Sequence, residues 1–258
     1  MQGIGSVAIP RIVVSVVSHG QEQLLKPLLN DFRRLEHQAI HAVMVTHNQV
    51  PFEAAKNPLP PSEAIAFREH VADKPRGFAS NHNAAFALLD REFQLNENDW
   101  FLVMNPDIRL KVHNLSGLRL HHDQQSGVVA PLVLDEEDRP SDAARELPSP
   151  ANLLKRYVLG RSASSEPLWF AGMFLAVRVA CWRALKGFDE SYYLYCEDTD
   201  FCLRARLAGW SIRHETSYAV RHSAQRASHR SLRHFLWHTK SLMRLWRSDP
   251  YRSAKARL

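Results

Sequence analysis

The sequence has few cysteines and no long apolar run. Its three cysteines, Cys181, Cys196 and Cys202, are odd in number and form no CxxC pair, which excludes a disulfide framework and the usual zinc spacing. No apolar run approaches the ~20 residues that a membrane-spanning helix needs. Only one basic residue, Arg11, precedes the first apolar run, which starts too late for a signal peptide. We therefore expect a cytoplasmic protein.

The positive charge is unevenly distributed along the chain. The 258 residues carry 33 Lys and Arg against 27 Asp and Glu, a net charge of +6, and 45% of them are hydrophobic, as in ordinary globular proteins. Residues 226–258 hold nine of the basic residues and one acid, a net +8, whereas residues 1–225 carry −2. Because a slightly acidic body is a poor partner for DNA or RNA, we expect no nucleic-acid binding.

The first part of the chain alternates between short apolar runs and helical patterns. The apolar runs predict buried strands at residues 12–17, 42–46, 65–68, 100–104 and 128–134. A helical pattern follows the first run, and residues 77–89 predict a loop that leads into a second helix. This alternation predicts an α/β fold with a mostly parallel sheet flanked by helices. In such sheets ligands bind at the carboxyl ends of the strands.

One long segment fits neither pattern. Residues 135–167 begin with a run of acids and are then rich in Pro, Ser and Arg. Such a stretch is typical either of a mobile flap or of a long surface excursion, and the sequence leaves both interpretations open.

The tripeptide Asn105-Pro106-Asp107 directly follows the apolar run at 100–104. A carboxylate at the carboxyl end of a strand can bridge Mg²⁺ or Mn²⁺ to a diphosphate, since these cations need only one or two carboxylates beside phosphate oxygens. The residues Asn-Pro-Asp also favour a tight turn that needs no ligand. Alone, the tripeptide does not decide between a metal site and a turn.

A second cluster of acids lies between Gly187 and Trp210. Glu197, Asp198 and Asp200 stand just before a helical pattern that ends at Gly209, where carboxylates favour the positive end of the helix dipole. Three carboxylates in four residues exceed what capping requires. Because neighbouring carboxylates raise one another's pKa, the cluster also suits a general base.

Several short segments follow one another in a characteristic order. They are Gly-Phe-Ala-Ser-Asn-His-Asn at 77–83, Asn-Pro-Asp at 105–107, Trp-Phe-Ala-Gly-Met at 169–173, Gly-Phe-Asp-Glu at 187–190, Tyr-Leu-Tyr-Cys-Glu-Asp-Thr-Asp at 193–200, Ala-Gly-Trp at 208–210 and His222. In this order the segments resemble the family 2 glycosyltransferases of GT-A fold, in particular the rhamnosyltransferase-like branch that builds bacterial surface polysaccharides. The resemblance covers residues 10–225 and favours the metal interpretation of Asn-Pro-Asp. It implies a GT-A, Rossmann-like mixed sheet with a C-terminal amphipathic helix.

The resemblance also implies roles for single residues. Asp107 would hold a divalent metal, Mn²⁺ or Mg²⁺, with His222 completing its shell. Asp198 would be the base that deprotonates the acceptor hydroxyl, with Glu197 orienting or repelling it. The implied donor-binding residues are Ser18, Asn48, Arg76, Asn83, Asn105 and Asp107. The implied acceptor-binding residues are Trp169, Gly172 and Met173.

Two positions depart from the pattern of this family. Asn105 stands where many members have Asp, which weakens the expectation of strict metal dependence. The second predicted strand ends in Thr46-His47-Asn48 and lacks the acid that reads a pyrimidine ring, so base recognition would rest on Asn48, Ser18 or backbone groups. The branch favours dTDP-rhamnose weakly over UDP-sugars as the donor.

We therefore expect an inverting glycosyltransferase that moves a sugar from a dTDP- or UDP-sugar to a bacterial surface polysaccharide or a lipid-linked glycan. Two alternatives stay open. A sugar nucleotidyltransferase is disfavoured because no glycine-rich phosphate loop follows the first strand. A catalytically silent glycan- or membrane-binding module is the other, since Thr46 and Asn105 depart from the family.

The basic tail, residues 226–258, contains a cationic amphipathic pattern. Apolar residues recur at helical spacing over 231–247, basic residues alternate with them, and Asp249-Pro250 stops the pattern. Such a helix packs on the catalytic domain at 1–225, attaches to an anionic membrane with Trp237 and Trp246 as anchors, or forms an oligomer contact. Membrane attachment would place the protein on the inner face of a bacterial inner membrane.

Overall fold

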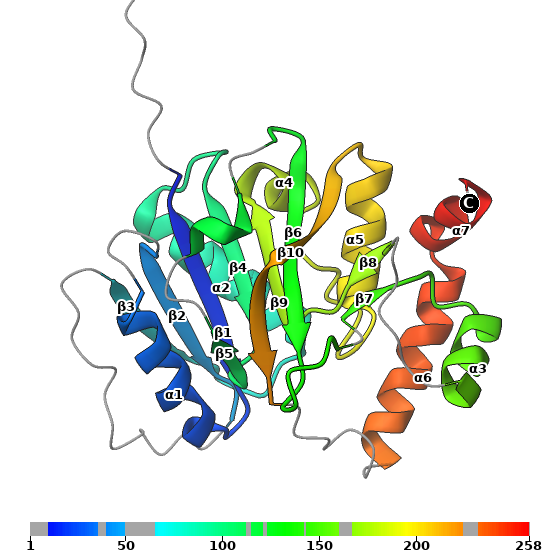
Figure 1. Ribbon diagram of the computed structural model, residues 1–258, viewed down its shortest axis with the longest axis horizontal. Coiled ribbons are helices and arrows are strands. Elements are labelled where there is room, and N and C mark those ends of the chain that lie inside the picture. The colour runs from blue at the N-terminus through cyan, green and yellow to red at the C-terminus, as the bar shows by residue number, and fades with distance from the viewer. Residues whose placement is uncertain are drawn as a thin grey trace, which may run out of the picture.

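The structure is a computed structural model that describes residues 10–35, 40–49, 65–111, 115–120, 123–141, 143–159, 167–223 and 232–257. At its centre lies an eight-stranded sheet in the order β3-β2-β1-β4-β9-β6-β10-β5 (Figure 1). Its strands are β1 Ile12–Ser18, β2 Ala42–His47, β3 Ala66–Val71, β4 Trp100–Met104, β5 Ile108–Leu110, β6 Ser126–Leu134, β9 Phe174–Arg178 and β10 Ser211–His222. A separate two-stranded ribbon pairs β7, Ala144–Arg145, with β8, Trp169–Phe170.

The sheet is mixed and mostly parallel. β3, β2, β1 and β4 run parallel to one another, as do β6 and β10. β9 runs antiparallel between β4 and β6, and β5 runs antiparallel at the edge beside β10. The carboxyl ends of β1, β2, β4, β6 and β10 therefore share one edge, and β9 begins there.

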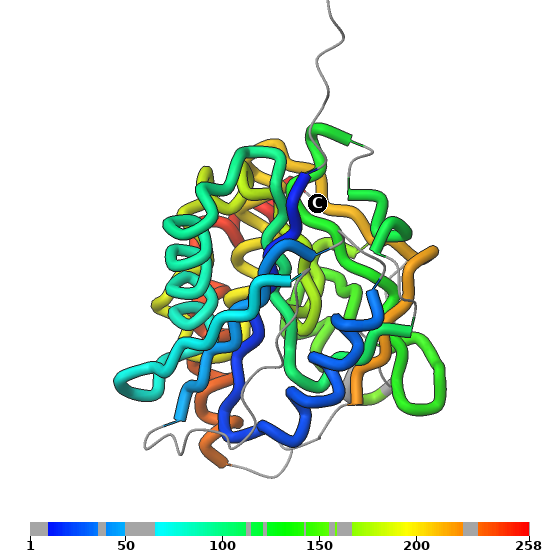
Figure 2. The backbone as a smooth tube through the Cα atoms, turned by 90° about the vertical axis from the view of Figure 1, so that its left-hand side faces the viewer, coloured from blue at the N-terminus to red at the C-terminus, as the bar shows by residue number. Residues whose placement is uncertain are grey.

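Helices cover both faces of the sheet because its buried strands alternate their side chains. Val14 and Val16 of β1 face one side, where they join α1, Glu22–Arg33, and the 3₁₀ helix η1, Leu115–Leu118. Val13 faces the other side, which is covered by helices α2 Phe78–Phe93, α4 Val179–Ala184 and α5 Glu197–Leu207. Figure 2 shows the two layers edge-on. This arrangement confirms the predicted fold class.

All five predicted strands are present, with ends shifted by at most three residues. β9 has no counterpart among the predictions, because its short apolar run continues directly from the segment at 169–173 that the family resemblance assigned to the site. The described parts of segment 135–167 contain β7 and the helix α3, Pro150–Leu159. Ala143, Ala144 and Leu147 are buried, so this segment packs partly into the body.

The tail forms two helices, α6 Leu232–Arg247 and α7 Asp249–Arg257. Asp249-Pro250 does end the first helix, but it also starts a second one that the sequence did not predict. Ser248 precedes α7 and its Oγ accepts a hydrogen bond from the Tyr251 N–H at 3.3 Å, and proline is well tolerated in a first helical turn.

The tail helices pack on the body through a small apolar cluster. Its buried members are Leu147, Tyr192, Cys196, Leu203, Leu242, Leu245 and Tyr251. The packing alternative is thus confirmed for one face of α6. The predicted boundary at residue 225 lies outside the described residues. Within the described part of the chain, no helix is long and apolar enough to cross a membrane.

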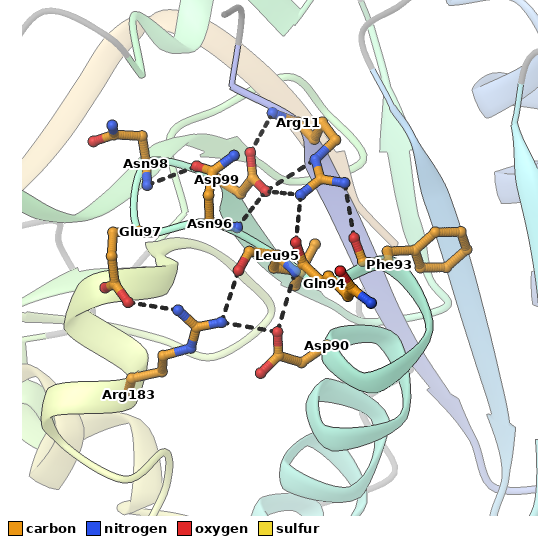
Figure 3. A network of polar contacts seen from close by, with 10 residues as sticks. All are labelled: Arg11, Asp90, Phe93, Gln94, Leu95, Asn96, Glu97, Asn98, Asp99 and Arg183. Atoms are coloured by element: carbon orange, nitrogen blue, oxygen red, sulfur yellow. Dashed lines mark hydrogen bonds and ion pairs between the residues drawn. The ribbon is translucent and has the colours of Figure 1, made fainter.

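A polar network fastens the amino ends of β1 and β4 (Figure 3). The buried carboxylate of Asp99 accepts bonds from the guanidinium of Arg11 at 2.6 and 3.0 Å and from the Arg11 backbone N–H at 2.8 Å. Arg183 joins α4 to the same corner through Asp90 at 2.9 Å. This network lies at the opposite end of the strands from the edge where their carboxyl ends meet, so it anchors the sheet without occupying that edge.

Candidate functional site

The carboxyl edge of the sheet gathers segments that are far apart in the sequence. Asn105-Pro106-Asp107 follows β4, and His222 ends β10. The Asn105 N–H donates to the carbonyl of Met173 at 3.0 Å, which places the start of β9 beside the tripeptide. The segment at 169–173, predicted as acceptor-binding, thus borders the predicted metal site.

Asp107 and His222 face each other at this edge. Nε2 of His222 lies 3.1 Å from Oδ2 of Asp107, and both side chains are largely buried. Within the part of the chain that the structure describes, neither Nε2 of His222 nor Oδ1 of Asp107 makes a hydrogen bond. Buried polar atoms are rarely left in this state. An imidazole nitrogen and a carboxylate oxygen are ligands that Mn²⁺ accepts, so this pair fits a divalent cation.

The pair supplies only part of a coordination shell. Among the described residues, no group of three or more His, Cys, Asp or Glu side chains could hold a metal ion. A cation bound here would need further oxygen ligands, which a diphosphate can provide. Asn105, at the same turn, is half-buried.

Asp198 and Glu197 stand at the start of α5. Oδ2 of Asp198 accepts the backbone N–H of Gly172 at 2.8 Å, and Oδ1 accepts that of Thr199 at 2.7 Å. Burial raises the pKa of Asp198, while the Gly172 bond and the charge of Arg145 lower it. Burial and the neighbouring Asp198 raise the pKa of Glu197 well above its ordinary value. The Gly172 bond and Arg145 thus favour the ionised form of Asp198, whereas burial and Asp198 favour the protonated form of Glu197.

The backbone before α5 is strained. Tyr195 and Cys196 both have left-handed conformations, with φ of 73° and 68°. Non-glycine residues adopt this region at a cost of about 1–2 kcal/mol each, so the surrounding contacts must hold them there. The carbonyl of Tyr193, two residues earlier, accepts the Phe78 N–H at 2.9 Å. A Cβ at Gly77 would lie 2.4 Å from that carbonyl, which explains the glycine of the Gly-Phe segment.

Arg145 is a site residue that the sequence did not single out. It pairs with Trp169 in the β7–β8 ribbon, and its guanidinium lies 4.8 Å from the centre of the Trp169 ring. Its charge acts on Asp198. The long acidic and Pro-rich segment around it gave no pattern that could have revealed it, because the ribbon is two residues long and its partner is distant in sequence.

Asn48 and Ser18, predicted to contact the donor, hold the backbone at the carboxyl ends of β2 and β1. The amide of Asn48 donates to the carbonyl of Arg76 at 2.7 Å and accepts the Arg76 N–H at 2.8 Å. The hydroxyl of Ser18 accepts the Gln21 N–H at 3.0 Å and lies 3.2 Å from a carboxylate oxygen of Glu22. Asn48 thus positions Arg76 at the edge, and donor contact by these residues stays a prediction.

Asn83 and Arg204 also make contacts within the fold. Asn83 exchanges hydrogen bonds with the backbone of Phe188 at 2.9 and 3.0 Å, which joins α2 to the loop before α5. Arg204 binds Asp200 at 2.6 Å and the carbonyl of Gly187 at 3.0 Å. Arg204 therefore joins α5 to the loop that precedes it, and a donor role for Asn83 remains a prediction.

The tail helix α6 reaches this edge as well. Nδ1 of His234 lies 2.9 Å from the hydroxyl of Tyr195. His19, which follows β1, has a lowered pKa because of its burial and, second, because of the nearby His234. The end of β1 and helix α6 thus meet beside the segment that leads to Glu197 and Asp198.

Similar proteins are known for this chain. It is 26% identical over 248 residues to the rhamnosyltransferase WbbL of Escherichia coli K12, covering 90% of this chain and 91% of that protein. It is 28% identical over 164 residues to an N-acetylglucosaminyl-diphospho-decaprenol L-rhamnosyltransferase of Mycobacterium tuberculosis, covering 56% of this chain and 53% of that one. No model of a protein family matches.

Solved structures share the fold. The mannosyltransferase PcManGT of Pyrobaculum calidifontis, in complex with GDP-Man and Mn²⁺, aligns over 95% of this chain and 67% of its own, with a TM-score of 0.60 and 14% identity. TarS 1–349 of S. aureus, in complex with UDP, aligns over 93% and 66%, with a TM-score of 0.59 and 15% identity. The similar rhamnosyltransferases and the shared fold agree with the residues gathered at the edge: this chain has the GT-A fold of glycosyltransferases and is similar in sequence to rhamnosyltransferases.

Proposed function

We propose that the chain transfers a sugar from a nucleotide diphosphate to an acceptor hydroxyl by a single inverting displacement. The observation that carries this is that adjacent residues contact both parts of the site: the Gly172 N–H donates to Asp198, and the Met173 carbonyl accepts the N–H of Asn105, two residues before Asp107. Asp198 takes the proton of the acceptor hydroxyl as its oxygen bonds to the anomeric carbon. The bond from that carbon to the diphosphate breaks with its electron pair on the departing oxygen.

Asp107 and His222 are the residues that would hold the divalent cation, Mn²⁺ or Mg²⁺. A bound cation would neutralise charge on the departing diphosphate. Asp107 and His222 suit this role because Nε2 of His222 lies 3.1 Å from Oδ2 of Asp107, and Oδ1 of Asp107 has no hydrogen-bond partner among the described residues. Arg76, whose backbone is held by Asn48, would add a cation at the same edge.

The donor in this proposal is a dTDP- or UDP-sugar, with rhamnose as the leading sugar because the two relatives named above are rhamnosyltransferases. The acceptor is a glycan carried on a lipid diphosphate, a class named for the mycobacterial relative. The protein would then work at the inner face of a bacterial inner membrane. Gly172, whose N–H donates to Asp198, would form the acceptor floor together with Trp169 and Met173.

Titration calorimetry with UDP and with dTDP, each with and without Mn²⁺, tests the donor half of the proposal. We expect micromolar binding that weakens at least tenfold without Mn²⁺, and the same weakening in Asp107→Ala. Absence of binding to either nucleotide would overturn the transferase assignment in favour of a silent module. Release of diphosphate from a nucleoside triphosphate and sugar phosphate would instead favour a nucleotidyltransferase.

The variant Asp198→Asn tests the base. Its amide keeps the shape of the side chain but cannot take up the acceptor proton, so we expect unchanged nucleotide affinity and a loss of transfer of about 10²-fold or more. Transfer is measured with a panel of nucleotide sugars, and Asp200→Asn is the matched control on the same helix turn. Full turnover in Asp198→Asn would remove this residue from the base role.

A further inference from the structure

The inner face of helix α6 holds the segment that presents the base. Three contacts reach three successive residues just before Glu197 and Asp198. They are the Ser241 hydroxyl to the Leu194 carbonyl at 2.9 Å, Nδ1 of His234 to the Tyr195 hydroxyl at 2.9 Å, and the Trp237 ring to the Tyr193 ring at 5.0 Å. The strained Tyr195–Cys196 backbone lies at the end of this segment.

The outer face of α6 is apolar and exposed. Its large side chains leave much of their surface in water: Leu232 83%, Phe235 65%, Leu236 65% and Met243 42%. At 100° per residue, Leu232, Leu236 and Met243 fall on one stripe, and Lys240 and Arg247 fall beside it. Both of these basic side chains are exposed. An apolar stripe bordered by cations complements an anionic bilayer surface.

We propose that the outer face of α6 docks on an anionic bilayer and that docking steadies the segment 193–196, so that membrane binding is coupled to presentation of the base. The role of Asp198 as that base rests on the proposed function. Docking of α6 and steadying of segment 193–196 do not rest on the proposed function, since they concern only α6 and the segment that it contacts. The proposed occupant is a bilayer because the outer face of α6 combines large exposed aliphatic side chains and Phe235 with cations.

The coupling follows from how little of α6 the body buries. Only Ser241, Leu242 and Leu245 of its 16 residues are buried. A helix of this length is marginal in water unless packing supports it. A bilayer bound to the outer face stabilises the helix, and the helix must be formed for the inner contacts to exist. By linkage, each interaction then strengthens the other.

Co-sedimentation with vesicles of phosphatidylglycerol and phosphatidylcholine, against vesicles of phosphatidylcholine alone, tests docking. We expect preference for the anionic vesicles. In K240E/R247E we expect about thirtyfold weaker binding, because two attractions of about 1 kcal/mol each are lost and every 1.4 kcal/mol is about tenfold in affinity. The matched control K26E/R33E reverses the same charge on α1, at the far side of the sheet (Figure 1). Equal losses in the two variants would overturn a site on α6.

Hydrogen exchange of the amides at 192–200 tests the coupling. In the wild type we expect severalfold slower exchange when anionic vesicles are added, and no slowing in K240E/R247E. Ser241→Ala removes an inner contact and leaves the outer face intact, so it should still prefer anionic vesicles, with somewhat weaker binding than the wild type because of the linkage, and should show less slowing. Vesicle binding without any change in exchange at 192–200 would overturn the coupling.

A second copy of the chain is the competing occupant. Slowing of the same amides with rising protein concentration, in the absence of vesicles, would show self-association and overturn membrane docking. None of these measurements uses a donor or an acceptor. Failure of the transferase assignment therefore shows in calorimetry and turnover, and failure of this proposal shows in sedimentation and exchange.

Discussion

At the scale of single residues, Arg145 acts on Asp198, the proposed base, from a strand only two residues long. Its guanidinium lies over Trp169, and its charge opposes the rise that burial imposes on the pKa of Asp198. Glu197 beside it has its pKa raised well above the ordinary value. Arg145 therefore favours the ionised form of Asp198, while burial and Asp198 favour the protonated form of Glu197, and such a separation of two pKa values suits a general base.

Arg145→Gln should move the acid limb of the rate profile to higher pH. Without the positive charge, Asp198 holds its proton to a higher pH, and the base is active only when that proton is gone. We expect a severalfold loss of turnover near pH 6 that recovers at high pH, measured as kcat against pH. Arg145→Lys keeps the charge and should keep the limb near its original position. An equal loss at every pH would point to a structural role instead.

At the scale of elements, helix α2 ends in a residue with an unfavourable, left-handed backbone conformation. Gln94 has φ of 46° and ψ of 65° at the C-cap, its N–H donates to the Asp90 carbonyl, and its side chain is exposed. Glycine is the usual residue in this conformation. Gln94→Gly should raise the free energy of unfolding by about 0.5–1 kcal/mol, because the left-handed cost exceeds the added entropy of the unfolded chain. Urea unfolding measures the change, and Gln94→Ala, which keeps the strain, should give no gain.

The same scale shows which elements a sequence can predict. Trp100–Met104 is a run of five buried residues, and it is a strand at the predicted bounds. Local pattern suffices there because the run is buried on both faces of the sheet. The β7–β8 ribbon depends on pairing Arg145 with Trp169 across a long, irregular segment, so its sequence carries no period. For the site, motifs predicted Asp107 and Asp198 as candidates, while the contacts of Arg145 and His234 exist only after folding.

At the scale of the whole molecule, two sets of buried groups oppose each other in their effect on stability. His82 is fully buried, with Nδ1 2.8 Å from the Ser15 hydroxyl. Burial, and then the neighbouring His19, lower the pKa of His82 to about 3. Burial raises the pKa of Glu197, Asp198 and Asp200. In both sets burial therefore disfavours the charged form.

The signs of the two contributions differ. Below pH ~6.5 the unfolded chain protonates His82 and the folded chain does not, so this contribution to the free energy of unfolding falls by about 1.4 kcal/mol per pH unit on acidification. Above pH ~4.3 the unfolded chain ionises Glu197 and the folded chain does not until its raised pKa is passed. The contribution of Glu197 is therefore present at low pH and lost as pH rises.

Between pH 4.5 and 6.5 these slopes cancel in part, and single variants should separate them. His82→Gln removes the destabilising proton uptake of the unfolded chain, so its free energy of unfolding should fall less than that of the wild type as pH drops. Glu197→Gln removes the opposing contribution, so the free energy of unfolding of this variant should fall more steeply than that of the wild type as pH drops. Urea unfolding across this pH range, with His70→Gln on edge strand β3 as the control for losing one histidine, measures the slopes. Parallel curves for the wild type and both variants would contradict this assignment, because slope, unlike absolute stability, does not respond to a packing defect.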